Sequence, residues 1–187
     1  MTRQTPHLEL REPSLTLLPA YAAALERGWS FNSLRDASKE LEAIHADPSA
    51  FIAERLAQTG TVELPDGSKV PKLPNRLRWM WDGEFAGQIG LRWQPVSDAL
   101  PGHVLGHIGF AVVPWKRRRG YATAALRLML PEAHAVGLGR VEVTADVANI
   151  ASRRVIEANG GRPIREFVDP RHGPEPKVLY SIDLTRP

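Results

Sequence analysis

Apolar residues near the amino end of the chain recur with the spacing of amphipathic helices. Asp47 followed by Pro48 is typical of a helix start, and Gly28 follows an alanine-rich run, as expected at a helix end. The elements predicted here are a strand over Leu8–Arg11 and helices over Leu17–Arg27, Ser33–His45 and Pro48–Gln58.

Alternation of apolar and polar residues replaces the helical spacing in the middle of the chain. Arg76–Trp81 and Glu84–Trp93 are β-like runs that flank Asp82-Gly83, a strong signal for a tight hairpin. Gly60–Asn75 holds a Pro-Asp-Gly turn and further prolines, which predicts a loop or a short hairpin over that turn.

Strand and helix patterns alternate in the second half of the chain, which predicts an α+β fold with a parallel crossover unit inside a mixed sheet. Pro131 lies within one helical pattern and predicts a kink there or a break near Leu130. The predicted elements are a strand over Val104–Val113, a helix over Thr123–Val136, a strand over Arg140–Ala145, a helix over Ile150–Ala158 and an antiparallel pair over Ile164–Val168 and Val178–Leu184.

Composition fits one globular domain over residues 1–187, with 43% hydrophobic and 24% charged residues. The absence of cysteine excludes disulfides, thiolate metal sites and a cysteine nucleophile. The first residues lack the apolar core of a signal peptide, and no apolar window has the length of a membrane span. We therefore expect a cytoplasmic protein with no membrane partner.

Positive charge is concentrated at Lys116–Arg119, although the net charge of the chain is only +3. Such a run is often a solvated surface, and a nucleic-acid or nuclear-localisation patch is the other common interpretation. Its place between a predicted strand and a predicted helix argues against both. Trp115 and Tyr121 are its only neighbouring aromatic residues, so base stacking is poorly supported and we expect no nucleic-acid partner.

Arg117–Gly120, which we call the basic turn, leads from the apolar run Ile108–Val113 into the predicted helix. Free main-chain N–H groups at a helix start converge on one point, and the helix dipole favours an anion there. Gly120 permits backbone conformations closed to other residues and a close approach by a ligand. The pattern predicts a diphosphate-binding site.

Arg117, Gly120 and Ala122 fit the pattern Arg/Gln-x-x-Gly-x-Gly/Ala, and Asn149–Gly161 supplies a second motif further along the chain. Together these motifs resemble the GNAT superfamily of acyl-CoA-dependent N-acetyltransferases, over about residues 76–184. With the run Gly106–Phe110, the chain is most similar to a bacterial subgroup of predicted acetyltransferases.

The resemblance implies a mixed, mostly antiparallel sheet with a central splayed parallel strand pair and flanking helices. It implies acetyl-CoA as cosubstrate, with the pantetheine arm along the main chain of Phe110 and Val112. Asn149 and Ser152 would face the thioester end, although Asn149 is also a natural helix N-cap. The diphosphate would lie on Arg117, Arg118, Arg119, Gly120, Tyr121, Ala122 and Thr123.

Acetyl transfer to an amine needs a base, and direct attack in a ternary complex is the simplest scheme without a cysteine carrier. Many GNAT enzymes place a glutamate base where this chain has Gly106 and His107, so His107 is one candidate base, although a strand histidine is more often a packed residue. Asp146 and Glu142, near the second splayed strand, are the others.

The family's tyrosine general acid corresponds to Ile156, which cannot donate a proton. His103 and His107 would lie roughly 13 Å apart on a regular strand, so we expect no metal. The expected acceptor bears a primary amine, on a small molecule or a peptide; the alternative is an acyl-CoA-binding sensor or interaction module with little catalysis. The sequence is compatible with a homodimer. Tryptophans could line the acceptor site, but core packing suits most of them better.

Overall fold

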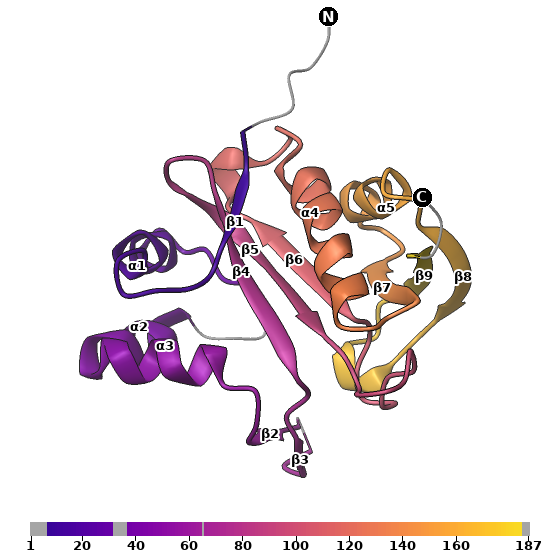
Figure 1. Ribbon diagram of the computed structural model, residues 1–187, viewed down its shortest axis with the longest axis horizontal. Coiled ribbons are helices and arrows are strands. Elements are labelled where there is room, and N and C mark those ends of the chain that lie inside the picture. Colours follow the sequence, from indigo (N-terminus) through magenta and orange to yellow (C-terminus); the bar gives the residue numbers. More distant parts are fainter. Residues whose placement is uncertain (1–6, 32–36, 65, 185–187) are drawn as a thin grey trace, which may run out of the picture. The chain divides into compact units, whose positions relative to one another are not determined.

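The computed structural model describes residues 7–31, 37–64 and 66–184, and its fold is α+β, as expected. The strand pairs β1–β4, β2–β3, β7–β9 and β8–β9 are antiparallel. The strands form three sheets (Figure 1). The first has the order β1-β4-β5-β6, built from Glu9–Arg11, Asn75–Trp81, Phe85–Arg92 and Ile108–Val112. The second pairs β2 (Thr61–Glu63) with β3 (Lys69–Pro71), and the third has the order β7-β9-β8, built from Arg140–Asp146, Lys177–Asp183 and Arg162–Phe167.

The helices fall close to their predicted positions: α1 (Leu18–Glu26), α2 (Ala37–Ala46), α3 (Pro48–Leu56), α4 (Tyr121–Ala135) and α5 (Ile150–Glu157). The beginning of the predicted helix at Ser33 lies outside the described residues. Helix α4 continues past Pro131, so the predicted break is wrong. None of the helices in the described ranges combines the length and apolarity needed to cross a bilayer.

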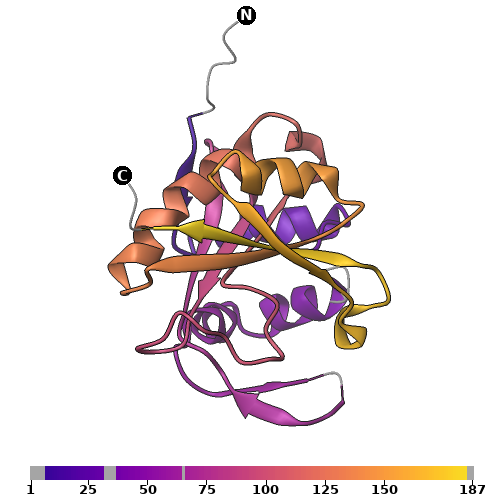
Figure 2. The ribbon, with the colours of Figure 1, turned by 90° about the vertical axis from the view of Figure 1, so that its right-hand side faces the viewer.

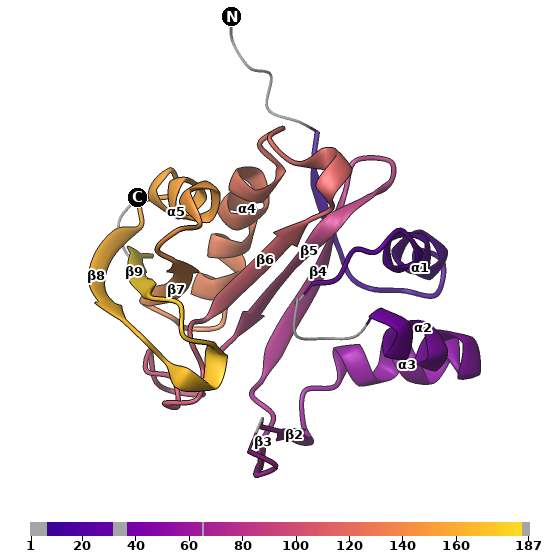
Figure 3. The ribbon, with the colours of Figure 1, turned by 180° about the vertical axis from the view of Figure 1, so that it is seen from behind.

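The chain divides into two compact units, each assembled from separate segments. The first comprises Met1–Ala57, Arg76–Ile89 and Phe110–Ala125; the second comprises Gln58–Asn75, Gly90–Gly109 and Leu126–Pro187. Strands β5 and β6 and helix α4 contribute residues to both units. Figure 3 shows β4, β5 and β6 side by side, in the order of the sheet.

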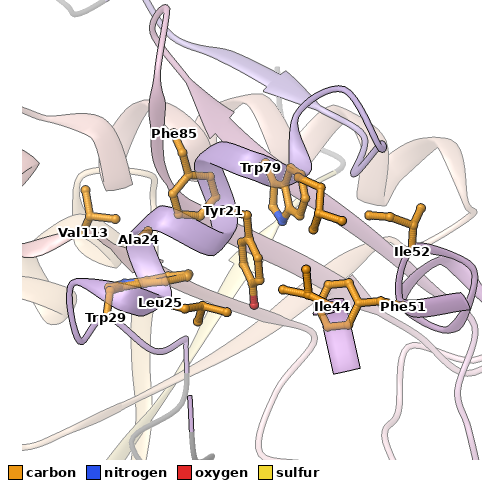
Figure 4. Close-up of a cluster of buried hydrophobic side chains, with 11 residues drawn as sticks. Tyr21, Ala24, Leu25, Trp29, Ile44, Phe51, Ile52, Trp79, Phe85 and Val113 are labelled. Carbon is orange, nitrogen blue, oxygen red and sulfur yellow. The ribbon is translucent and has the colours of Figure 1, made fainter. Parts of the chain in front are cut away.

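The core of the first unit is aromatic, and helices α1, α2 and α3 supply much of it (Figure 4). The Tyr21 ring stacks on Trp79 with their centroids 4.9 Å apart, and both contact Phe85 edge-on. Trp29 meets Tyr21 and Phe85 in the same way. Trp29 and Trp79 are therefore core residues, because both are almost fully buried.

The second unit is organised by the sheet β7-β9-β8, with α5 beside it (Figure 2). Strand β9 pairs with both neighbours, which confirms the predicted closing pair. The buried Tyr180 hydroxyl, on β9, donates a hydrogen bond to Glu157 at 2.9 Å and accepts one from Arg153 at 3.0 Å. These bonds tie α5 to the middle strand.

Strand β6 begins at Ile108, later than the predicted start at Val104, because the preceding residues bond to β7. The Leu105 carbonyl accepts a hydrogen bond from the Thr144 hydroxyl. A Cβ on Gly106 would lie 2.9 Å from the Glu142 carbonyl oxygen, so the two segments touch there with no room for a side chain. Beyond this junction no ladder joins β6 to β7 in the described residues, and the two strands belong to separate sheets.

Candidate active site

The basic turn connects a short 3-10 helix, Pro114–Lys116, to the first residue of α4. Its backbone is left-handed at Arg118 (φ 61°) and at Gly120 (φ 85°). The Gly120 carbonyl accepts the Ala124 N–H at 3.0 Å, so α4 starts directly after the glycine. Left-handed residues within a turn make successive N–H groups converge, which is a geometry suited to anions.

Main-chain donors in this turn are open. Within the described residues, no hydrogen bond occupies the N–H groups of Arg118, Arg119, Gly120, Tyr121 and Ala122. The first N–H groups of a helix have no intrahelical acceptor, and those of the turn add to them. The site therefore presents a row of unpaired donors at the positive end of a fifteen-residue helix.

The three arginines of the turn differ in their contacts. Arg117 Nε donates to the Val112 carbonyl at 3.2 Å and thereby fixes the end of β6. Arg118 and Arg119 are exposed, and neither makes a hydrogen bond or ion pair within the described residues. These two guanidinium groups are free to meet an anion with paired donors.

Strand β6 has one free edge next to this turn. Val113 N–H donates to the Ala86 carbonyl of β5 at 3.0 Å, so the alternation of an antiparallel pair turns the main-chain groups of Phe110 and Val112 away from β5. Within the described residues, β5 is the only strand partner of β6. These groups are suited to bind an extended ligand as a further strand; the Val112 carbonyl already accepts from Arg117.

Lys116 and Tyr121, on either side of the basic turn, both bind Asp82. Lys116 Nζ lies 2.6 Å from Asp82 Oδ1 and 3.1 Å from Glu84 Oε2. The Tyr121 hydroxyl donates to Asp82 Oδ2 at 2.5 Å. The sequence does not predict this link, because the Asp82-Gly83 pattern indicates only a turn, and no local signal connects it to residues more than thirty positions away.

Ionisation follows from these contacts. Burial alone would raise the pKa of Asp82, but the hydrogen bonds from Lys116 and Tyr121 outweigh it and hold this pKa below its ordinary value. Burial alone would lower the pKa of Lys116, but its hydrogen bonds to Asp82 and Glu84 outweigh this effect and hold the pKa above its usual value. The bond to Asp82, assisted by burial, raises the pKa of Tyr121. At neutral pH the cluster is a charged lysine, a carboxylate and a neutral phenol.

His107 lies at the junction with β7, in the second unit, and is fully buried. Its N–H donates to the Glu142 carbonyl at 2.7 Å, and its Nδ1 accepts the Glu142 N–H at 2.9 Å. The proton of the neutral ring must then sit on Nε2, which is buried and finds no hydrogen-bond partner in the part of the chain that the structure describes. Burial, with smaller effects of nearby charges, lowers the pKa of His107 to about 4. This geometry favours the packed, hydrogen-bonded interpretation and leaves no ring nitrogen to accept a proton.

The two carboxylates of β7 differ in their partners. Asp146 Oδ1 pairs with the buried Lys177 ammonium at 2.7 Å. The half-buried Glu142 side chain makes no hydrogen bond or ion pair within the described residues. Both side chains lie on the same face of β7, opposite the buried Val143. Glu142 is therefore the carboxylate with the freer oxygens.

Helix α5 brings Asn149 and Ser152 together. Asn149 Oδ1 accepts the Ser152 N–H at 3.0 Å, which confirms Asn149 as the N-cap of the helix. Ile156, at the place of the family's tyrosine, is fully buried in this helix. A polar group there would have to enter the core, so the described residues offer no counterpart of that acid on α5.

Comparison with known proteins agrees with this architecture. Residues 7–162 match the family model of the acetyltransferase (GNAT) domain. No curated protein matches the chain. The fold resembles Mycobacterium smegmatis RimJ in complex with CoA-disulfide, at 23% identity over 96% of this chain and 83% of that one, with a TM-score of 0.66.

Two more solved structures share the fold. RimL, a ribosomal L7/L12 alpha-N-protein acetyltransferase in complex with coenzyme A, is 14% identical over 97% of each chain, with a TM-score of 0.62. The microcin C7 self-immunity acetyltransferase MccE, in complex with acetyl-CoA and AMP, is 12% identical over 94% of this chain and 92% of that one, with a TM-score of 0.64. With the family model matching most of its length, this chain belongs to the GNAT acetyltransferase family.

Proposed function

We propose that this protein transfers the acetyl group of acetyl-CoA to a primary amine of a small molecule or peptide. The observation that carries this proposal is the row of open main-chain donors in the basic turn at the start of α4. Neighbours of the same fold, solved with acetyl-CoA or coenzyme A, support it. RimL, named for its action on a protein α-amine, makes a peptide acceptor a reasonable first choice for testing.

In this proposal each part of the site has a separate role. The N–H groups of residues 118–122 bind the diphosphate, with Arg118 and Arg119 adding charge. The free edge of β6 at Phe110 and Val112 binds the pantetheine arm, and Asn149 and Ser152 contact its far end. Holding thioester and amine together then supplies much of the rate enhancement.

Proton removal from the acceptor amine is assigned to a carboxylate of β7, directly or through water. Glu142 is the first choice because its carboxylate has no hydrogen-bond or ion-pair partner among the described residues, whereas Asp146 is paired with Lys177. His107 is not proposed as the base, since its Nδ1 is occupied by a main-chain N–H. With Ile156 buried, water is the proposed source of any proton for the thiolate.

A coenzyme-binding sensor with little catalysis is the second candidate. The sensor is favoured by the residues at the family's usual base and acid positions. These are a histidine whose Nδ1 is occupied by a main-chain N–H and a buried isoleucine. Thiol release from acetyl-CoA with a panel of peptides and small amines separates the two. Amine-dependent release supports the enzyme; a coenzyme-induced rise in melting temperature with no release across the panel supports the sensor.

A further inference from the structure

Asp82 lies outside the proposed ligand contacts but is joined to both ends of the basic turn. It occupies the β4–β5 hairpin, where its Oδ1 also accepts the Glu84 N–H at 3.2 Å. Its two carboxylate oxygens bind different donors: Oδ1 binds Lys116 Nζ and Oδ2 binds the Tyr121 hydroxyl. One carboxylate therefore links three segments of the first unit.

The two donors bracket the turn. Lys116 is the last residue of the 3-10 helix, and Tyr121 is the first residue of α4. Both residues are more than nine-tenths buried, at 6% and 7% exposure. Because both ends are attached to one carboxylate, their separation is fixed, and with it the span of the main chain between them.

The turn needs such a restraint. Arg118 holds a left-handed backbone that residues with a Cβ adopt rarely, and such conformations persist where the surroundings impose them. Within the described residues, Arg118 and Arg119 are exposed and make no side-chain hydrogen bond or ion pair that would impose it. The attachment at Asp82 is the contact that encloses this segment on both sides.

The same cluster separates the roles of the basic residues. Lys116 is neutralised by Asp82 and, at 3.1 Å, by Glu84, and its ammonium is directed toward the hairpin. It therefore serves as a structural cation, whereas the exposed arginines of the turn remain for a ligand.

We infer that Asp82 is a positioning residue for the coenzyme site: acting through Lys116 and Tyr121, it holds the turn in the form that binds the diphosphate. This inference rests on the proposed function. The donors must be aligned before the ligand arrives, because a mobile turn would have to be ordered on binding and would bind more weakly.

Calorimetric titration with coenzyme A tests the inference on the full chain. Asp82→Ala should raise the Kd for coenzyme A by about tenfold or more, and Asp82→Asn, which keeps an acceptor, by a smaller factor. Tyr121→Phe should weaken binding as well. The double variant Asp82→Ala/Tyr121→Phe should lose less than the product of the single effects, because the two residues act through one bond.

Asp47→Ala is the matched control. Asp47 caps α3 through the Ala50 N–H, in the same unit, so its loss lowers stability without touching the turn. If Asp82→Ala binds coenzyme A as wild type does, or no worse than Asp47→Ala at equal loss of melting temperature, the inference is wrong. Should Asp82→Ala fail to fold, Asp82→Asn and Tyr121→Phe decide by the same criterion. Wild-type protein that does not bind coenzyme A would instead refute the proposed function.

Discussion

His107 and Glu142 are joined twice: the histidine main chain donates to the Glu142 carbonyl, and the histidine ring accepts the Glu142 N–H. The imidazole takes the place that a main-chain carbonyl would hold in a regular ladder. The pair therefore closes the junction at the point where the strands β6 and β7 separate into different sheets. Four predictions concern this junction, the proposed diphosphate site and the proposed base.

Replacing His107 by alanine should lower the free energy of unfolding by roughly 2–4 kcal/mol, because the variant leaves a cavity and an unpaired buried N–H. His103→Ala, at a half-buried histidine in the same unit, should change it by less than about 1 kcal/mol. Urea unfolding measures both. If the two variants unfold alike, the junction does not contribute as described.

The pKa of His107, about 4 in the folded chain, makes stability depend on pH. Between about pH 6.5 and 4 the unfolded chain holds the proton more tightly, so stability is full above this window and decreases as pH falls through it. The difference corresponds to roughly 3 kcal/mol. Unfolding in urea at several pH values measures it.

His107→Asn is the control for this pH dependence, since its carbonyl oxygen can accept the Glu142 N–H without titrating. This variant should lack that part of the slope. It should also keep turnover per folded molecule within a factor of about 10, because the ring is not the proposed base. If turnover of His107→Asn falls by roughly 10²-fold or more at constant stability, His107 is the base after all.

Gly120→Glu should abolish coenzyme binding, because the side chain fills the turn and brings a negative charge toward the diphosphate. The substitution also strains the backbone, since Gly120 has φ 85°. Gly160→Glu is the matched control: Gly160 has φ 84° with open space around it, so strain and charge are equal. Titration with acetyl-CoA should show binding by the control alone; equal binding by both contradicts the assignment.

Glu142→Gln should reduce turnover by about 10²-fold or more while leaving the affinity for coenzyme A unchanged, because the amide cannot take the amine proton. Asp146→Asn should act chiefly on stability, since the buried Lys177 loses its charged partner. Steady-state rates with an accepted amine and coenzyme titration distinguish the two. Undiminished turnover in Glu142→Gln would place the base elsewhere.

Local chemistry determined which elements could be predicted. The starts of α3 and α5 follow from Asp47 and Asn149, each of which accepts an N–H three residues later. The β4–β5 hairpin likewise follows from Asp82-Gly83. These signals are read within a few residues, so no knowledge of the tertiary fold is needed.

Features that depend on residues far apart in the chain could not be predicted from local sequence patterns. Strand β6 starts later than predicted because the residues before it bond to Glu142 and Thr144. Nothing in the apolar run at 104–113 indicates these partners. In the same way, the charge run 116–119 predicts an anion site but not that Lys116 is neutralised by a hairpin carboxylate. At Pro131, α4 continues, so of the two predicted outcomes, a kink or a break, the break does not occur.

Gly106 has a consequence for attempts to engineer this protein. Even the methyl group of alanine would collide with the opposite main chain, so every replacement forces the two backbones apart. A library of variants should therefore keep Gly106 unchanged and vary residues whose side chains are exposed to solvent. Natural homologues are likewise expected to keep glycine at this position more strictly than they keep the residues at neighbouring positions.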